Sequence, residues 1–177
     1  MRVVVTAKVK AVTPKSQRLL SFLMAFRDST QYIVNEIWRL EHIPSIKELH
    51  QRFYRLLRSQ GFRAHHCHKI ERRAREVVKA TKRNNGCKPV LRKLTARLDY
   101  QDARVELDKG VVRVIIRDKW YTLKLKHGGD YIWRFKELRW KEVHVKYENR
   151  KLYVSVVFES DYKPYISRGI IALDVNL

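Results

Sequence analysis

The sequence lacks several features that would place it in a familiar protein class. Its two cysteines, Cys67 and Cys87, are too few for a disulfide framework, and whether they form a single bridge stays open from the sequence. No apolar run approaches the roughly 20 residues that a membrane-spanning helix needs. The N-terminal residues alternate like a strand and lack the long apolar segment of a secretory signal. We therefore expect an intracellular protein without a membrane partner.

Acidic residues are also scarce. The chain has 18 Asp and Glu residues against 39 Lys and Arg residues, which gives a formal net charge of +21. A positive field of this strength attracts polyanions. Hydrophobic residues make up 45% of the chain and aromatic residues 11%, which indicates a folded core and not a disordered basic tail. The composition therefore predicts a folded nucleic-acid-binding protein.

Hydrophobic periodicity predicts one strand and then a long helix at the start of the chain. Residues 1–12 alternate between apolar and other side chains, as a strand does. Thr13 and Pro14 form a helix start, after which apolar residues recur every three to four positions as far as about Glu41. Whether this helix breaks near Asp28 stays open.

Two further helices follow with recognisable ends. Ser45 and Glu48 have the spacing of a capping box, in which each side chain accepts a hydrogen bond from the other's backbone N–H. Gly61 is placed to end this second helix in the left-handed conformation. A third helix is predicted over residues 64–83, with Cys67 on its apolar face.

After Pro89 the hydrophobic period changes from that of a helix to the two-residue period of strands. The predicted strands are 103–107, 111–116, 120–126, 143–147 and 152–158. The first strand is best explained if it pairs with these later strands. We therefore expect an α+β fold, a small antiparallel β-barrel of wedge or OB-like type with an inserted three-helix lobe. The expected boundaries are 1–12 for the first barrel strand, 13–88 for the lobe, 89–163 for the rest of the barrel and 168–177 for a further strand.

The densest positive charge lies in the third predicted helix and just after it. Between Phe62 and Lys93 there are 11 Lys and Arg residues and two Glu residues, a net charge of +9. These charges repel one another unless an anion neutralises them, which favours phosphate binding over a solvated surface with a few ion pairs. The residues predicted to contact nucleic acid here are Lys69, Arg72, Arg73, Arg75, Lys79, Lys82 and Arg83.

The same helix contains the run His65-His66-Cys67-His68. Successive helical residues diverge by about 100°, so at most two of these side chains can face one metal ion. The run therefore favours a buried Cys67 with exposed histidines near a phosphate backbone, and not a metal site.

Aromatic residues alternate with basic ones around Trp120 and Trp133. Bases of single-stranded nucleic acid stack on such side chains in small barrels. The alternative is that each tryptophan fills the barrel interior.

Four acids, Asp99, Asp102, Glu106 and Asp108, lie on or beside predicted strands. They could form a metal cluster, but carboxylates at strand ends next to arginines are usually solvent-exposed ion pairs. The sequence has no Gly-rich phosphate loop and no Ser/His/Asp set, so we expect no small-molecule substrate.

The C-terminal segment, Gly169-Ile170-Ile171-Ala172-Leu173-Asp174-Val175-Asn176-Leu177, is an apolar run that leads to one carboxylate. It is similar to the first RuvC motif of the OrfB/TnpB family, although Ala172 and Asn176 stand where that family often has Gly. The order of strand, helices, barrel and acid-tipped strand also resembles the N-terminal part of that family. Its members are RNA-guided nucleases associated with insertion sequences and related to type V CRISPR effectors.

This resemblance implies a function. Asp174 would be the first catalytic and metal-binding carboxylate, one of three that hold two Mg²⁺ ions in the complete nuclease. Guide RNA and double- and single-stranded DNA would be the partners. Tyr32 and Asn35 would belong to the recognition lobe. The protein would lie in the cytoplasm or nucleoid of a prokaryote, and its sequence would be archaeal-like.

The second and third carboxylates and the zinc ribbon of the family would lie beyond Leu177. We therefore expect this chain alone to bind no cofactor and to be inactive as a nuclease. Two other hypotheses stay open. The chain could be a stand-alone RNA- or DNA-binding module derived from a transposon, or a metal nuclease that uses the acids at positions 99 to 108.

Overall fold

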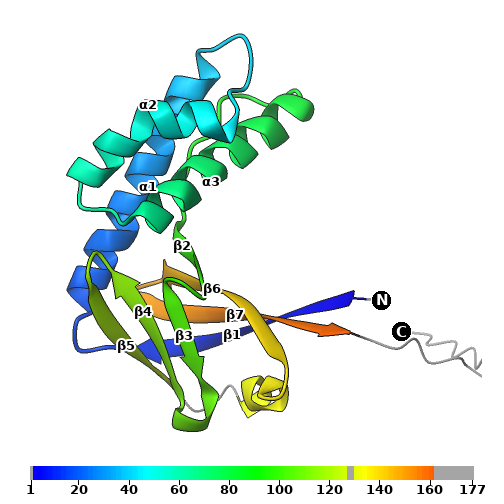
Figure 1. The fold of residues 1–177 in the computed structure, drawn as a ribbon. Coiled ribbons are helices and arrows are strands. Elements are labelled where there is room, and N and C mark those ends of the chain that lie inside the picture. The colour runs from blue at the N-terminus through cyan, green and yellow to red at the C-terminus, as the bar shows by residue number, and fades with distance from the viewer. Residues whose placement is uncertain (1, 127–129, 162–177) are drawn as a thin grey trace, which may run out of the picture.

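The computed structural model describes residues 2–126 and 130–161, which form an α+β protein with three α-helices and a seven-stranded antiparallel sheet. The helices lie together on one side of the molecule and the sheet on the other (Figure 1). The strand expected at 168–177, with Asp174, lies outside the described residues.

Helix α1 (Ser16–Trp38) begins two residues later than predicted. Lys15 is the N-cap residue, and Pro14 lies in the preceding turn. The helix is unbroken at Asp28. The polar residues after it are satisfied without a break, because the Ser29 hydroxyl donates to the Gln60 side chain and the Thr30 hydroxyl donates to a carbonyl one turn earlier.

Helix α2 (Ile46–Ser59) has the ends that the sequence predicts. The Glu48 N–H donates to the Ser45 hydroxyl at 3.3 Å, and the Ser45 N–H donates to the Glu48 carboxylate at 2.6 Å. Gly61 has a φ of +82°, which lets the Phe62 N–H donate to the carbonyl of Leu57. Both the capping box and the glycine terminator are therefore confirmed.

Helix α3 (Ala64–Arg83) packs against both α1 and α2. Its buried apolar residues recur at helical spacing, since Cys67, Ile70, Ala74 and Val78 are all fully buried. Cys67 therefore lies in the helix core, as expected. The exposed Cys87 and the buried Cys67 are both free thiols, and burial raises the pKa of Cys67 to about 11. The cysteines form no bridge.

The sheet has the strand order β2-β6-β7-β1-β5-β4-β3, and every pairing in it is antiparallel. It curls into a nearly closed barrel (Figure 1). The strands are β1 (Arg2–Val12), β2 (Leu94–Asp99), β3 (Ala103–Glu106), β4 (Val111–Ile116), β5 (Lys119–Leu125), β6 (Arg139–Glu148) and β7 (Lys151–Asp161). Two short 3₁₀ segments, Leu107–Lys109 and Asp130–Phe135, lie within the described connections.

Strand β1 lies near the middle of the sheet although it comes first in the chain. It pairs with β7 from Arg2 to Ala11 and with β5 at Ala11 and Val12. The expected pairing of the first strand with the later ones is therefore confirmed. The three helices follow β1 and precede β2, so the chain leaves the sheet at Val12 and returns to it at Leu94.

Strand β2 was not predicted from the sequence. It contains Ala96 and Arg97 and so has only a weak hydrophobic alternation, yet Ala96 and Leu98 are buried and the strand pairs fully with β6. β2 is also the strand that the helices contact most closely, through α1 and α3. It therefore forms the junction between the helical layer and the sheet. Among the described residues, no helix has the length and apolar character that crossing a membrane requires.

Candidate nucleic-acid interface

A cleft lies at the junction of α1, α3 and β2. It consists of two adjoining cavities of about 330 and 180 Å³, which share Phe26, Arg73 and Thr95 in their walls. Phe26 comes from α1, Arg73 from α3 and Thr95 from β2. The cleft is therefore positioned by the packing of the helical layer on the sheet.

Positive side chains dominate the walls of this cleft. Arg27 pairs with Asp28 and Lys69 pairs with Asp99, each at 2.7 Å. The other cations form no ion pair within residues 2–126 and 130–161, although Glu76 and Glu142 also line the cleft. These unpaired cations are Arg72, Arg73, Arg92, Lys93 and Arg97. Five cations without an ion pair, against two glutamates in the same concave surface, favour an anionic ligand.

Arg73 lines both cavities of the cleft, where burial and a neighbouring positive charge act on it. Its side chain is half-buried, and burial lowers the pKa of its guanidinium group. The positive charge of Arg97 lowers this pKa further, and Glu76 opposes the effect only in part. A phosphate group between Arg73 and Arg97 would relieve this repulsion, because each guanidinium can donate two parallel hydrogen bonds to it.

The structure divides the predicted phosphate-contacting residues of α3 into three groups. Lys69, Arg72 and Arg73 line the cleft. Arg75 instead donates to the carbonyl of Pro44 at 2.8 Å, and Lys82 donates to that of Leu40 at 3.1 Å. These two residues tie α3 to the loop between α1 and α2.

The third group lies near the end of α3. Lys79 and Arg83 are exposed and line neither cavity of the cleft. The α1 residues Tyr32 and Asn35 also lie outside the cleft. Tyr32 is 47% exposed with its ring edge-on to Phe53, while Asn35 accepts a hydrogen bond from Gln31.

The two predicted stacking residues differ in accessibility. Trp120 on β5 is 36% exposed, with the guanidinium groups of Arg104 and Arg113 at 5.1 and 5.6 Å from its ring. Its ring is partly exposed, and the two arginine side chains lie over it. Trp133 packs partly against the hydrophobic core, as the alternative interpretation expected.

The four acids at positions 99 to 108 do not form a metal cluster in the structure. Asp99 pairs with Lys69, and Glu106 pairs with Lys109. Asp102 was expected to be a solvent-exposed ion pair, but it is fully buried and accepts a hydrogen bond from Arg63 at 2.9 Å. Since this contact joins the start of α3 to the turn between β2 and β3, Asp102 holds the helical layer on the sheet.

His66 lies beside Asp102, and its burial contradicts the expectation for this residue. It was predicted to be exposed near a phosphate backbone, yet it is fully buried against Phe22, and its Nε2 lies 3.5 Å from Asp102 Oδ1. Burial lowers the pKa of His66 to about 4, with smaller contributions from Arg63 and His65. Burial also raises the pKa of Asp102.

Sequence reasoning missed several cleft residues. Arg97 was missed because β2 was not recognised, and Arg27 because it lies on a mostly apolar helix. Arg92 and Lys93 fall inside the basic segment but were not selected, since no periodic pattern indicated which way they face. Arg97 and Thr95 have the two-residue spacing of one strand face, and this was the one available signal.

No protein-family model matches this chain, and no curated protein matches its sequence. The resemblance to the OrfB/TnpB family therefore rests on the order of the elements and on the C-terminal motif.

Proposed function

We propose that the cleft between α3 and β2 of this chain binds the phosphate backbone of a nucleic acid. The observation that carries the proposal is the set of unpaired cations around the half-buried Arg73. Backbone binding of this kind is independent of base sequence, since Lys and Arg contact phosphate oxygens. The exposed Trp120 lies on a separate, basic part of the sheet and would stack on an unpaired base.

Within this proposal, the chain is the N-terminal part of a TnpB-like, RNA-guided DNA endonuclease. The three helices between β1 and β2 would be its recognition lobe, and the curled sheet its wedge barrel. The cleft would then hold the guide RNA or its heteroduplex with the target, which such proteins recognise by backbone and shape. Asp174, the expected first carboxylate of the nuclease, lies outside the described residues.

A stand-alone binding module is the second candidate. The observation that favours it is that residues between Phe26 and Glu142 already form the walls of the cleft in the part of the chain that the structure describes. Both candidates predict the same binding and differ only in whether a nuclease accompanies it.

The salt dependence of RNA binding tests the shared proposal. Fluorescence anisotropy with a labelled RNA hairpin should give a dissociation constant that rises steeply between 50 and 300 mM KCl. Each neutralised phosphate contributes about −0.7 to −0.9 to the slope of log affinity against log salt. Five cleft cations therefore predict a slope of about −4. An affinity that stays constant across this range would contradict the proposal, and so would a slope unchanged in Arg73→Gln.

A further inference from the structure

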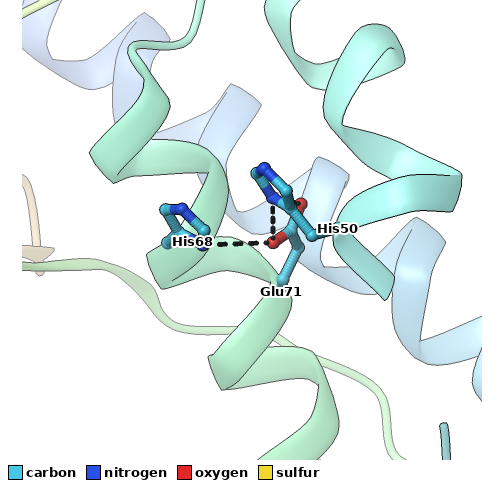
Figure 2. A group of neighbouring side chains, drawn as sticks. All are labelled: His50, His68 and Glu71. Atoms are coloured by element: carbon cyan, nitrogen blue, oxygen red, sulfur yellow. Dashed lines mark hydrogen bonds and ion pairs between the residues drawn. The ribbon is translucent and has the colours of Figure 1, made fainter. Parts of the chain in front are cut away.

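Three side chains able to bind a metal converge from two helices. His50 lies on α2, and His68 and Glu71 lie one turn apart on α3 (Figure 2). Nδ1 of His50 is 3.0 Å from Oε2 of Glu71, and Nδ1 of His68 is 3.7 Å from the same oxygen. All three ligand atoms lie within 4.8 Å of one another, which holds for no other such group in the part of the chain that the structure describes.

The packing of α2 on α3 builds this cluster. Residues three apart on a helix share a face, so His68 and Glu71 point together toward α2. The imidazole rings of His50 and His68 stack with their centroids 4.3 Å apart and their planes at 9°. Tyr54, one turn after His50, lies against the His50 ring at 4.4 Å. These ring contacts therefore bring the three side chains together without a ligand.

Glu71 gives the cluster its electrostatic character. Its side chain is fully buried, and no Lys or Arg among the described residues forms an ion pair with it. A buried carboxylate costs several kcal/mol unless a charge compensates it, and burial accordingly raises the pKa of Glu71. Its contacts in the cluster come from the imidazoles of His50 and His68. The site therefore holds a buried carboxylate that a metal cation would compensate, in a chain of net charge +21.

We propose that His50, His68 and Glu71 bind one Zn²⁺ ion and so join α2 to α3. Two imidazoles and one carboxylate are a recurring zinc-ligand set, with water in the fourth position. Ligand atoms around a tetrahedral zinc ion lie about 3.3–3.6 Å apart, given metal–ligand bonds of about 2.0–2.2 Å. The observed separations of 3.0 and 3.7 Å lie on either side of that range.

Binding needs only small changes in the ligands. The two rings turn out of their parallel stack so that both Nδ1 lone pairs point at the ion, and each neutral imidazole keeps its hydrogen on Nε2. The His50 and His68 side chains are 31% and 45% exposed, which leaves a route for the ion and for the fourth, water ligand. This site lies outside the cleft and does not depend on nucleic-acid binding.

The test uses the full 177-residue chain after treatment with a chelator. Titration with Co²⁺, followed by visible absorption, should show the intense bands of a four-coordinate ion and saturate at one ion per chain. Zn²⁺ should displace the Co²⁺ and bleach these bands. His50→Gln and His68→Gln should each weaken binding by at least about 100-fold. The matched controls are His42→Gln and His144→Gln, which remove an imidazole outside the cluster and should bind as the unaltered chain does.

Thermal unfolding provides a second readout. Zn²⁺ should raise the melting temperature of the unaltered chain and not that of His68→Gln, while far-UV circular dichroism without metal checks that both are folded. The proposal is overturned if the unaltered chain binds no Co²⁺ at millimolar concentration, or if the two cluster variants bind it as well as the controls do. The variant Arg92→Glu/Arg97→Glu alters two exposed cleft cations away from the cluster and should bind Zn²⁺ normally, so failure of the zinc site and failure of the cleft are distinguishable.

Discussion

The cations on two sides of α3 differ in whether they have bonding partners within the chain. On the cleft side, Arg72 and Arg73 form no ion pair among the described residues, although Glu76 partly offsets the charge of Arg73. On the side toward the loop between α1 and α2, Arg75 and Lys82 donate to carbonyl groups of their own chain. The comparison teaches that charge density alone does not identify binding residues. A cation is available to a ligand where the fold leaves its donors unused.

The largest effect should come from breaking the contact that fixes α3 to the sheet. Arg63→Met would leave the buried Asp102 without its cation, which should lower the free energy of unfolding by about 3 kcal/mol. Urea denaturation measures this change. Arg39→Met removes an exposed pair with Glu36 and should change stability by less than about 0.5 kcal/mol. Equal effects of the two variants would contradict a structural role for Arg63.

The buried His66 should make stability depend on pH. Its pKa is about 4 in the folded chain and about 6.5 when unfolded, so the unfolded state binds more protons between these values. The contribution of neutral His66 to the free energy of unfolding is therefore fully present above pH 6.5 and is lost as pH falls toward 4. From pH 7 to pH 5 this amounts to about 2 kcal/mol. The raised pKa of Asp102 has the opposite effect, because its contribution to the free energy of unfolding increases as pH falls.

Urea denaturation at pH 7 and pH 5 measures this contribution as a difference between variants. His66→Leu keeps the site apolar and removes the titrating group, so its loss of stability over this range should be smaller by about 2 kcal/mol. The same pH dependence in both proteins would show that His66 does not carry the effect.

A smaller effect separates the two sides of α3 directly. Arg75→Gln should lower the free energy of unfolding by about 1 kcal/mol, because it removes the hydrogen bond to Pro44, and should leave RNA affinity unchanged. Arg73→Gln should do the reverse, weakening RNA binding about tenfold without loss of stability, since burial and Arg97 disfavour the charge of Arg73 and it forms no ion pair among the described residues. Denaturation and anisotropy on both variants check this. If Arg75→Gln weakens binding as much as Arg73→Gln, the comparison fails.

Much of the fold follows from local signals in the sequence. The capping box at Ser45 and the glycine at Gly61 act within one turn of backbone, so their residues alone define where α2 begins and ends. Strand β2 has no such local signal, because Ala96 and Arg97 alternate weakly and the strand is defined by its pairing with β6. Pairing with a distant strand thus determines where β2 forms, and β2 is the element that connects the helical layer to the sheet.

The cleft and the proposed zinc site were also only partly predictable from local sequence. The basic segment predicted Lys69, Arg72 and Arg73, yet it gave no basis for separating them from Arg75, which is turned toward Pro44. The histidine run in α3 contains one member of the proposed zinc site, whose other imidazole, His50, comes from α2. Such groupings arise from helix packing, which spacing along one helix does not encode.

The most direct test of the account compares two charge reversals of equal size. Arg72→Glu/Arg73→Glu alters the cleft, while Lys47→Glu/Arg55→Glu alters two exposed cations on α2 that line no part of it. Each pair lowers the net charge by four units, from +21 to +17. Anisotropy with the same RNA at 150 mM KCl should show at least about a 100-fold loss of affinity for the cleft variant and a loss of about twofold for the α2 variant. Equal losses would mean that the chain attracts RNA by its overall charge, and the cleft would not be the binding site.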